Sequence, residues 1–275
     1  MLPPWLMFAI KKRAAPISTL TLTVLGLVLC NGCSEPGPRA LLQGDWLLRE
    51  GKCAQAIRIL EQAAQLLPKD ARAWNHLGLA YHGAGRAEDA VKAYQQALAL
   101  DRNLAAAHYN LGCLHLEQNN VPGALAELTS YTGLQPNLPH GWTKLGTAQL
   151  RARQLEAAEK SFHQALKLNT RSAEAWNGQG LVQTHRRRYQ EAYLQFNTAL
   201  RAQPDYAPAL LNLAILSHQY LNGRAPAVQK YREYLALQPQ APGAADIQQI
   251  IRQLELELRP PSRSASSNPG SPPSR

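Results

Sequence analysis

The chain has 275 residues and a formal net charge of +10, from 29 basic and 19 acidic residues. Such a charge can attract nucleic acid, but aromatic residues make up only 7% of the chain and fall at the core positions of a repeat described below, so no platform for stacking bases remains. Of the four cysteines, only Cys30 and Cys33 form a Cys-x-x-Cys pair, and a four-ligand zinc site needs a second pair. Composition therefore argues against a nucleic-acid binder and against a structural zinc site.

The first 33 residues are typical of a targeting segment. Three basic residues at 11–13 precede an apolar stretch from Ala14 to Leu29, and the segment ends in Gly32 and Cys33. A small residue directly before a cysteine resembles the processing box of bacterial lipoproteins, in which the cysteine is lipid-modified and becomes the new N-terminus. This resemblance implies a signal peptide over residues 1–32 and lipidation of Cys33. A serine follows the cysteine, which in such lipoproteins implies an outer-membrane location facing the periplasm.

An uncleaved signal anchor in the inner membrane and plain secretion remain alternatives. The 16 residues from Ala14 to Leu29 are fewer than the roughly 20 that a spanning helix needs, which favours cleavage. Cys30, in contrast, stands where leucine is more usual in the processing box. Met7 offers a second possible start with a more ordinary charged leader, so the sequence leaves the start open.

From residue 37 to residue 241 a pattern returns every 34 residues. Its eighth place is always tiny, its twentieth place is alanine, and apolar residues recur at helical spacing with a break near the turn, so each repeat predicts helix, turn, helix. Small residues on facing helices allow the close approach of a tight hairpin. The eighth places are Gly44, Gly78, Gly112, Gly146, Gly180 and Ala214. The repeats are 37–70, 71–104, 105–138, 139–172, 173–206 and 207–241, and the sixth carries one extra residue near its turn.

Repeat 71–104 carries Trp74, Leu77-Gly78, Tyr81, Ala90 and Tyr94 at places that resemble the tetratricopeptide repeat family. The resemblance implies an all-α fold, a right-handed superhelical solenoid of stacked helical hairpins that acts as a binding scaffold. The first repeat departs from the pattern, with alanine where tryptophan is usual, as expected of a terminal repeat.

The segments on either side of the repeats are short. Residues 33–36 link the predicted anchor to the first repeat. Residues 242–259 form an amphipathic helix expected to cap the last hairpin, because five apolar residues fall on one face. Residues 260–275 are rich in proline and serine and are expected to form a disordered tail.

The first helices of the hairpins are expected to line the inner face of the array. The side chains on this face form a mostly apolar floor with asparagine and histidine at the sides, suited to a peptide whose main chain the amides hold. Unspecialised surface is the alternative. The predicted groove residues are Asn75, Leu79, His82, Tyr109, Cys113, Thr143, Thr147, Asn177, Leu181, His185 and Ile215.

Positive charge concentrates in the fourth and fifth repeats, where residues 139–206 hold ten basic and five acidic groups. The 34-residue register places the arginines of both turns on one edge. This basic edge is either an ordinary solvated surface or a docking site for an acidic protein segment, lipid head groups or cell-wall anions. Its residues are Arg151, Arg153, Arg186, Arg187 and Arg188.

Motifs for chemistry are absent from the sequence. No His-Glu-x-x-His zinc motif, phosphate-binding loop or G-x-S-x-G nucleophile motif occurs. We therefore predict a non-catalytic scaffold without cofactor, metal or small-molecule substrate, which binds a protein or peptide partner in the bacterial envelope. In layout it resembles pilotin lipoproteins of type IV pilus assembly and periplasmic adaptors that recruit cell-wall enzymes. An accessory subunit of a cell-wall or glycosyl-transferring enzyme complex, or a signal-anchored membrane repeat protein, is the alternative.

Overall fold

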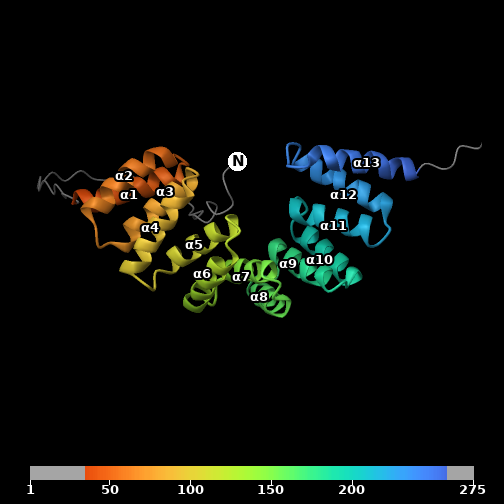
Figure 1. Ribbon diagram of the computed structural model, residues 1–275, viewed down its shortest axis with the longest axis horizontal. Helices are drawn as coiled ribbons and strands as arrows, with labels where there is room; N and C mark the ends of the chain where they lie inside the picture. The colour runs from red at the N-terminus through yellow and green to blue at the C-terminus, as the bar shows by residue number, and fades with distance from the viewer. Residues whose placement is uncertain (1–34, 259–275) are drawn as a thin grey trace, which may run out of the picture. The chain divides into compact units, whose positions relative to one another are not determined.

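The computed structural model describes residues 35–258, which form thirteen α-helices and no strand (Figure 1). Six antiparallel hairpins follow one another, and a single helix comes after them. The predicted all-α fold of stacked helical hairpins is thus confirmed. The predicted signal peptide, Cys33 and the tail after residue 259 lie outside the described residues.

The hairpins belong to two compact modules, and the chain passes from the first to the second between Gln135 and Pro136. The helices of the N-terminal module are α1 Pro36–Arg49, α2 Cys53–Leu66, α3 Ala71–Gly83, α4 Ala87–Leu100, α5 Ala105–Glu117 and α6 Val121–Leu134. Those of the C-terminal module are α7 Pro139–Arg151, α8 Leu155–Leu168, α9 Ala173–His185, α10 Tyr189–Ala202, α11 Ala207–Gln219, α12 Arg224–Leu237 and α13 Ala244–Leu258. Each predicted repeat contains one hairpin, and the extra residue of the sixth lies in the turn between α11 and α12.

Within each module the first helices of neighbouring hairpins pack against one another. Helix α3 contacts both α1 and α5, and α9 contacts both α7 and α11. The second helices of neighbouring hairpins make no comparable contact within residues 35–258. The first helices therefore form the tighter layer, on the inside of the curvature of each module.

The small eighth place makes room for a large side chain of the second helix. A Cβ atom built on Gly78 would lie 2.5 Å from the Tyr94 ring, and one on Gly180 would lie 2.5 Å from the Phe196 ring. Both rings are buried, with 0% and 1% of their surface exposed. The sequence predicted that small residues on facing helices let the two helices approach closely while large residues fill the volume around them. The residue that fills the space beside each of these glycines is the one at the twenty-fourth place, a ring in these two repeats and a leucine beside Gly44 and Gly112.

In three repeats the tryptophan of the fourth place joins the first helix to the loop before it. The indole N–H of Trp142 donates to the carbonyl oxygen of Pro136 at 2.8 Å, and that of Trp176 donates to the carbonyl oxygen of Thr170 at 2.9 Å. In the third repeat His108 replaces tryptophan, and its Nε2 lies 2.9 Å from the carbonyl oxygen of Arg102. The histidine thus reaches an acceptor six residues back, as the tryptophans do.

Every hairpin turn contains one residue with a left-handed backbone. Glycine and asparagine adopt this conformation most easily, and they occupy four of these places. Arginine occupies the other two. The residues and their φ angles are Gly51 (71°), Gly85 (76°), Asn119 (56°), Arg153 (58°), Arg187 (60°) and Asn222 (52°).

The last helix, α13, covers the apolar side of the sixth hairpin. Ile247, Ile251 and Leu254 are buried against α12. Arg224, at the start of α12, forms an ion pair of 2.6 Å with Glu257. None of the helices between residues 35 and 258 combines the length and apolar character needed to cross a membrane.

Candidate peptide-binding surfaces

All eleven predicted groove residues lie on first helices, five in the N-terminal module and six in the C-terminal module. Three of them, Asn75, Thr143 and Asn177, are buried. The first-helix side of each module is called its inner surface below. The inner surface of the N-terminal module carries Asn75, Leu79 and His82 of α3 and Tyr109 and Cys113 of α5. The inner surface of the C-terminal module carries Thr143 and Thr147 of α7, Asn177, Leu181 and His185 of α9, and Ile215 of α11.

A pair of asparagines joins neighbouring first helices on each inner surface. The Nδ2 group of Asn110 donates to Oδ1 of Asn75 at 3.0 Å, and that of Asn212 donates to Oδ1 of Asn177 at 2.9 Å. Asn75 and Asn177 are buried, with 5% and 7% exposed, whereas their partners are half-buried. Between residues 35 and 258 neither partner's Oδ1 accepts a hydrogen bond. The first asparagine of each pair therefore holds the second, whose carboxamide oxygen can accept from a ligand.

Sequence reasoning did not assign this role to Asn110 or Asn212. The two pairs each span 35 residues, one more than the repeat, because the sixth place of one first helix meets the fifth place of the preceding one. Asparagines separated by 35 residues in a 34-residue repeat are the signal that could have identified them.

An apolar side chain lies one helical turn after each buried asparagine. Leu79 follows Asn75, and Leu181 follows Asn177, and both leucines are half-buried against the core of their module. Ile215 of α11 is also half-buried, against the core beneath α13. A side-chain amide can bind one peptide group of a ligand, and the apolar side chain beside it can contact the ligand's next side chain.

Other groove residues are already used within the scaffold. The hydroxyl groups of Thr143 and Thr147 donate to carbonyl oxygens one turn back, each at 3.0 Å. Thr143 is buried, with 2% exposed, whereas Thr147 is half-buried and can offer its methyl group to a ligand. His82 lies 2.8 Å from Glu117 of α5. On α5 the ring of Tyr109 contacts that of Tyr131, with centroids 4.9 Å apart. Cys113 is half-buried and forms no disulfide.

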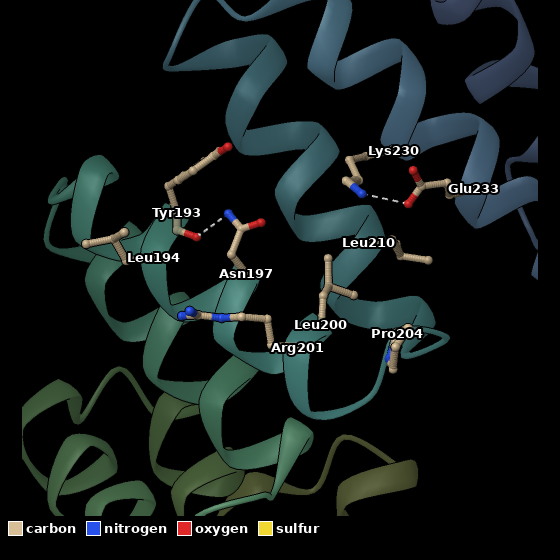
Figure 2. Close-up of a pocket in the computed structure, with 9 residues that line it drawn as sticks. All are labelled: Tyr193, Leu194, Asn197, Leu200, Arg201, Pro204, Leu210, Lys230 and Glu233. Carbon is tan, nitrogen blue, oxygen red and sulfur yellow. Dashed lines mark hydrogen bonds and ion pairs between the residues drawn. The ribbon is translucent and has the colours of Figure 1, made fainter.

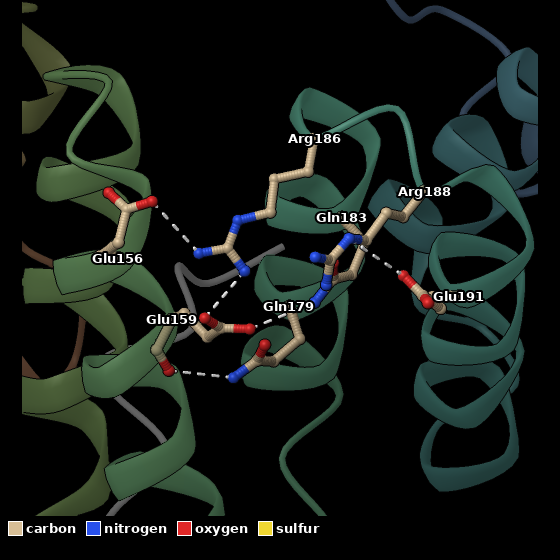
Figure 3. A network of polar contacts seen from close by, with 7 residues as sticks. All are labelled: Glu156, Glu159, Gln179, Gln183, Arg186, Arg188 and Glu191. Atoms are coloured by element: carbon tan, nitrogen blue, oxygen red, sulfur yellow. Dashed lines mark hydrogen bonds and ion pairs between the residues drawn. The ribbon is translucent and has the colours of Figure 1, made fainter.

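The predicted basic edge divides into paired and exposed arginines (Figure 3). The guanidinium of Arg186 donates to Glu159 at 2.8 Å and lies 3.5 Å from Glu156, and its side chain is only 18% exposed. These hydrogen bonds, to Glu159 first, raise the pKa of Arg186. Arg188 lies 3.8 Å from Glu191. Arg186 therefore has much of its charge compensated. The ion pair of Arg188 with Glu191 joins two side chains that are both more than half exposed, so it is weak.

The Arg186 contacts join α8 to α9. Gln179 donates a hydrogen bond of 3.0 Å to the backbone carbonyl oxygen of Glu159, and Gln183 donates one of 3.2 Å to the carboxylate of the same glutamate (Figure 3). Both glutamines are buried. This network holds the fourth hairpin to the fifth. By contrast, Arg153 and Arg187 lie exposed in the two turns.

A hollow of about 470 Å³ lies in the C-terminal module (Figure 2). It is bordered by α10, by the loop that leads to α11, by the start of α11, and by α12. Leucines and a proline form its apolar part, and two cations and a glutamate lie at its margin. The lining residues are Tyr193, Leu194, Asn197, Leu200, Arg201, Pro204, Leu210, Lys230 and Glu233. Lys230 and Glu233 form an ion pair of 2.7 Å, so their charges offset each other.

No three metal-ligating side chains converge in the part of the chain that the structure describes. The surfaces above offer carboxamides, apolar steps and a few charges, which suits the binding of polypeptide.

Comparison with known families gives the same fold. A model of the tetratricopeptide repeat matches residues 41–105 and 143–207, and a second model of this repeat matches residues 81–147. Together the matches cover more than half of the chain. No curated protein sequence matches it.

Several solved structures are similar. The pilF protein of Pseudomonas aeruginosa is 22% identical with a TM-score of 0.65, over 80% of this chain and 99% of that one. A chain of the APC/C hetero-tetramer Cut9–Hcn1 is 22% identical with a TM-score of 0.66, over 78% of this chain but only 42% of that one. YrrB, described as a TPR protein with an unusual peptide-binding site, is 21% identical with a TM-score of 0.52, over 69% of this chain and 97% of that one. At these identities the likeness concerns the fold.

Proposed function

This chain belongs to the tetratricopeptide repeat family, and from that premise we propose that it is a scaffold that holds peptide segments of a partner protein on its inner surfaces. We further propose that Cys33 tethers it by a lipid to the envelope of a bacterium. The family consists typically of non-catalytic interaction modules, and neither matching model belongs to an enzyme.

The asparagine pairs are the observation that carries the proposal. Each inner surface has one buried asparagine that fixes a half-buried one, with an apolar side chain one turn away. A half-buried carboxamide can still offer a donor and an acceptor to a peptide group, and a fixed rotamer reduces the entropy lost on binding. Each surface, taken by itself, therefore offers a peptide segment the same spacing of a polar and an apolar contact.

The envelope part of the proposal is supported by the sequence. Basic residues, a short apolar stretch and Gly32-Cys33 precede the first helix directly. Intact-mass measurement on protein extracted from membranes tests it. A mature chain that begins at Cys33 with added acyl mass is the expected result, whereas a chain that keeps residues 11–29 would favour the signal-anchor alternative.

Photo-crosslinking tests the binding surface. A benzophenone amino acid placed at Leu79 or Leu181 should form adducts with a partner in intact cells, because both side chains lie beside an asparagine pair. The same probe at Leu194, which is 61% exposed on α10, is the matched control away from the inner surface. We expect Asn110→Ala with Asn212→Ala to reduce the adducts at the inner positions while the far-ultraviolet circular dichroism stays unchanged. Equal adducts at inner and outer positions would contradict the assignment.

A further inference from the structure

The first helix, α1, has an uncovered apolar face. Leu42 is 70% exposed and Trp46 is 52% exposed, although large apolar side chains of this kind are usually buried. They are one helical turn apart and so share a face. The buried residues of α1 lie on the other side, against α2 and α3, and are Gly37, Ala40, Gly44, Leu47 and Leu48.

Polar groups frame this face. At 100° per residue, Leu42 and Trp46 fall opposite the centre of the buried set, with Arg39 on one flank and Arg49 on the other. Arg49 forms an ion pair of 2.9 Å with Asp45, while the Arg39 side chain makes no ion pair with any residue between 35 and 258. The ammonium group of Lys52 lies 4.9 Å from the centre of the Trp46 ring. An indole and a leucine between long cationic side chains match the boundary between lipid head groups and acyl chains, where tryptophan is enriched and arginine extends to the phosphates.

We propose that this face of α1 lies in the surface of the lipid bilayer to which the protein is attached, with Leu42 and Trp46 inserted at the head-group boundary. The inference rests on the proposed membrane attachment. It adds that the tether is short and that the N-terminal module has a defined contact with the membrane.

The length of chain before α1 supports this occupant. Only Ser34 and Glu35 separate Cys33 from Pro36, where α1 begins, and three residues reach at most about 11 Å. Leu42 lies roughly 9 Å further along the helix axis and Trp46 about 15 Å. A lipid on Cys33 therefore keeps both side chains within reach of the bilayer when α1 lies along it.

A second copy of the chain fits the face less well. A stable protein interface takes about 800 Å² and some 20–30 residues from each partner, while the apolar part of this face consists of two side chains bordered by charges. Membrane insertion needs a smaller area when a lipid already supplies attachment, because two weak signals together give stable anchoring.

Tryptophan fluorescence of the full-length protein in vesicles tests the proposal. The protein is reconstituted in phosphatidylcholine vesicles, with and without phospholipid that carries bromine near the head-group end of its acyl chains. Trp46→Phe is compared with the unaltered chain. In the unaltered chain the brominated lipid should remove about a quarter of the total tryptophan emission, because Trp46 is one of the four tryptophans after Cys33 and the one suited to interfacial depth. In Trp46→Phe this loss should disappear. The other three are half-buried, and each donates its indole N–H to a loop carbonyl.

A second pair of variants controls for folding. Leu42→Ser should reduce the quenching of Trp46, while Leu194→Ser, at a leucine of similar exposure on α10, should not. Equal quenching in the unaltered chain and in Trp46→Phe overturns the inference while leaving the anchor in place. Protection of Trp46 from both brominated lipid and aqueous acrylamide shows a protein surface on this face, and it also overturns the inference. Recovery of the full chain in the soluble fraction overturns both the attachment and the inference.

Discussion

Gly78→Ala sets two physical effects against each other. Alanine has the higher helix propensity, which by itself stabilises a helix interior by about 0.8–1 kcal/mol. At this site, however, the added Cβ would lie 2.5 Å and 2.6 Å from two ring carbons of Tyr94. That ring is fully buried and has no room to move away. Overpacking of a dense core costs about 1–3 kcal/mol, so we expect a net loss of about 1–2 kcal/mol in the free energy of unfolding.

The sixth repeat supplies a matched control. There Ala214 stands at the same place, opposite Tyr231, and both are buried. If each hairpin is spaced to fit its own residue, Ala214→Gly should also destabilise, by about 1 kcal/mol, because it lowers helix propensity and leaves a small void.

Local stability is the appropriate measurement, because stacked repeats unfold through nearest-neighbour units and one global midpoint can mislead. Hydrogen exchange followed by mass spectrometry reports it separately for peptides from α3 and α4 and for peptides from α11 and α12. Faster exchange is expected in α3 and α4 for Gly78→Ala. A gain in protection equal to the propensity difference would show that the Tyr94 ring does not limit this position and would refute the packing argument.

Three further predictions concern a turn, a buried hydroxyl and a helix cap. Arg187→Gly should stabilise the C-terminal module by about 0.5–1 kcal/mol in urea unfolding, because glycine adopts the left-handed backbone more easily; a loss of stability would show that the arginine side chain holds the turn. Tyr94→Phe should raise the free energy of unfolding by about 1 kcal/mol, since the buried hydroxyl of Tyr94 has no hydrogen-bond partner among the described residues. A clear decrease in the urea midpoint of unfolding would indicate that this hydroxyl does have a partner. Asp70→Ala removes the side chain that caps α3 by accepting from the Arg72 amide at 2.9 Å, and should cost about 1 kcal/mol at neutral pH. The hydrogen bond from Arg72 holds the pKa of Asp70 below 3.8, so this stability is present above pH 3.8 and is lost as the pH falls through the lower folded value. The control Asp70→Asn keeps a capping side chain that does not titrate. A stability difference between Asp70→Ala and the unaltered chain that persists undiminished at pH 2 would contradict the mechanism.

The sequence allowed the hairpins to be predicted because the signal for them is local. A 34-residue period and a tiny eighth place fix where two helices begin and turn. What the glycine faces was not predictable in the same way. Gly78 was predicted to let its helix approach Ala90 closely, with large residues filling the volume around the two. That the ring directly against Gly78 is Tyr94, four residues after Ala90, was not specified. Period and residue size place a residue along a helix, whereas its contact depends on the direction in which a neighbouring side chain extends.

The candidate site shows a similar division. That first helices form the inner surfaces follows from the repeat, and all predicted groove residues lie on them. The distinction between a buried Asn75 and a half-buried Asn110 depends on the offset between adjacent helices, which the sequence of one repeat does not contain. The ion pairs on the basic edge were not predictable for another reason. Arg186 reaches Glu159 on the preceding helix, and such pairing between repeats cannot be read from a net charge.

The six turns have a consequence for how the protein can diversify. Each contributes one outward residue from the same left-handed backbone, and four different hairpins already use glycine or asparagine there while two use arginine. The side chain at this place makes no part of the helix packing, so it can change at a cost of about 1–2 kcal/mol or less. Along each module the turns therefore present one variable residue per repeat, and substitutions there can change what the turns bind while the stacked helices stay as they are.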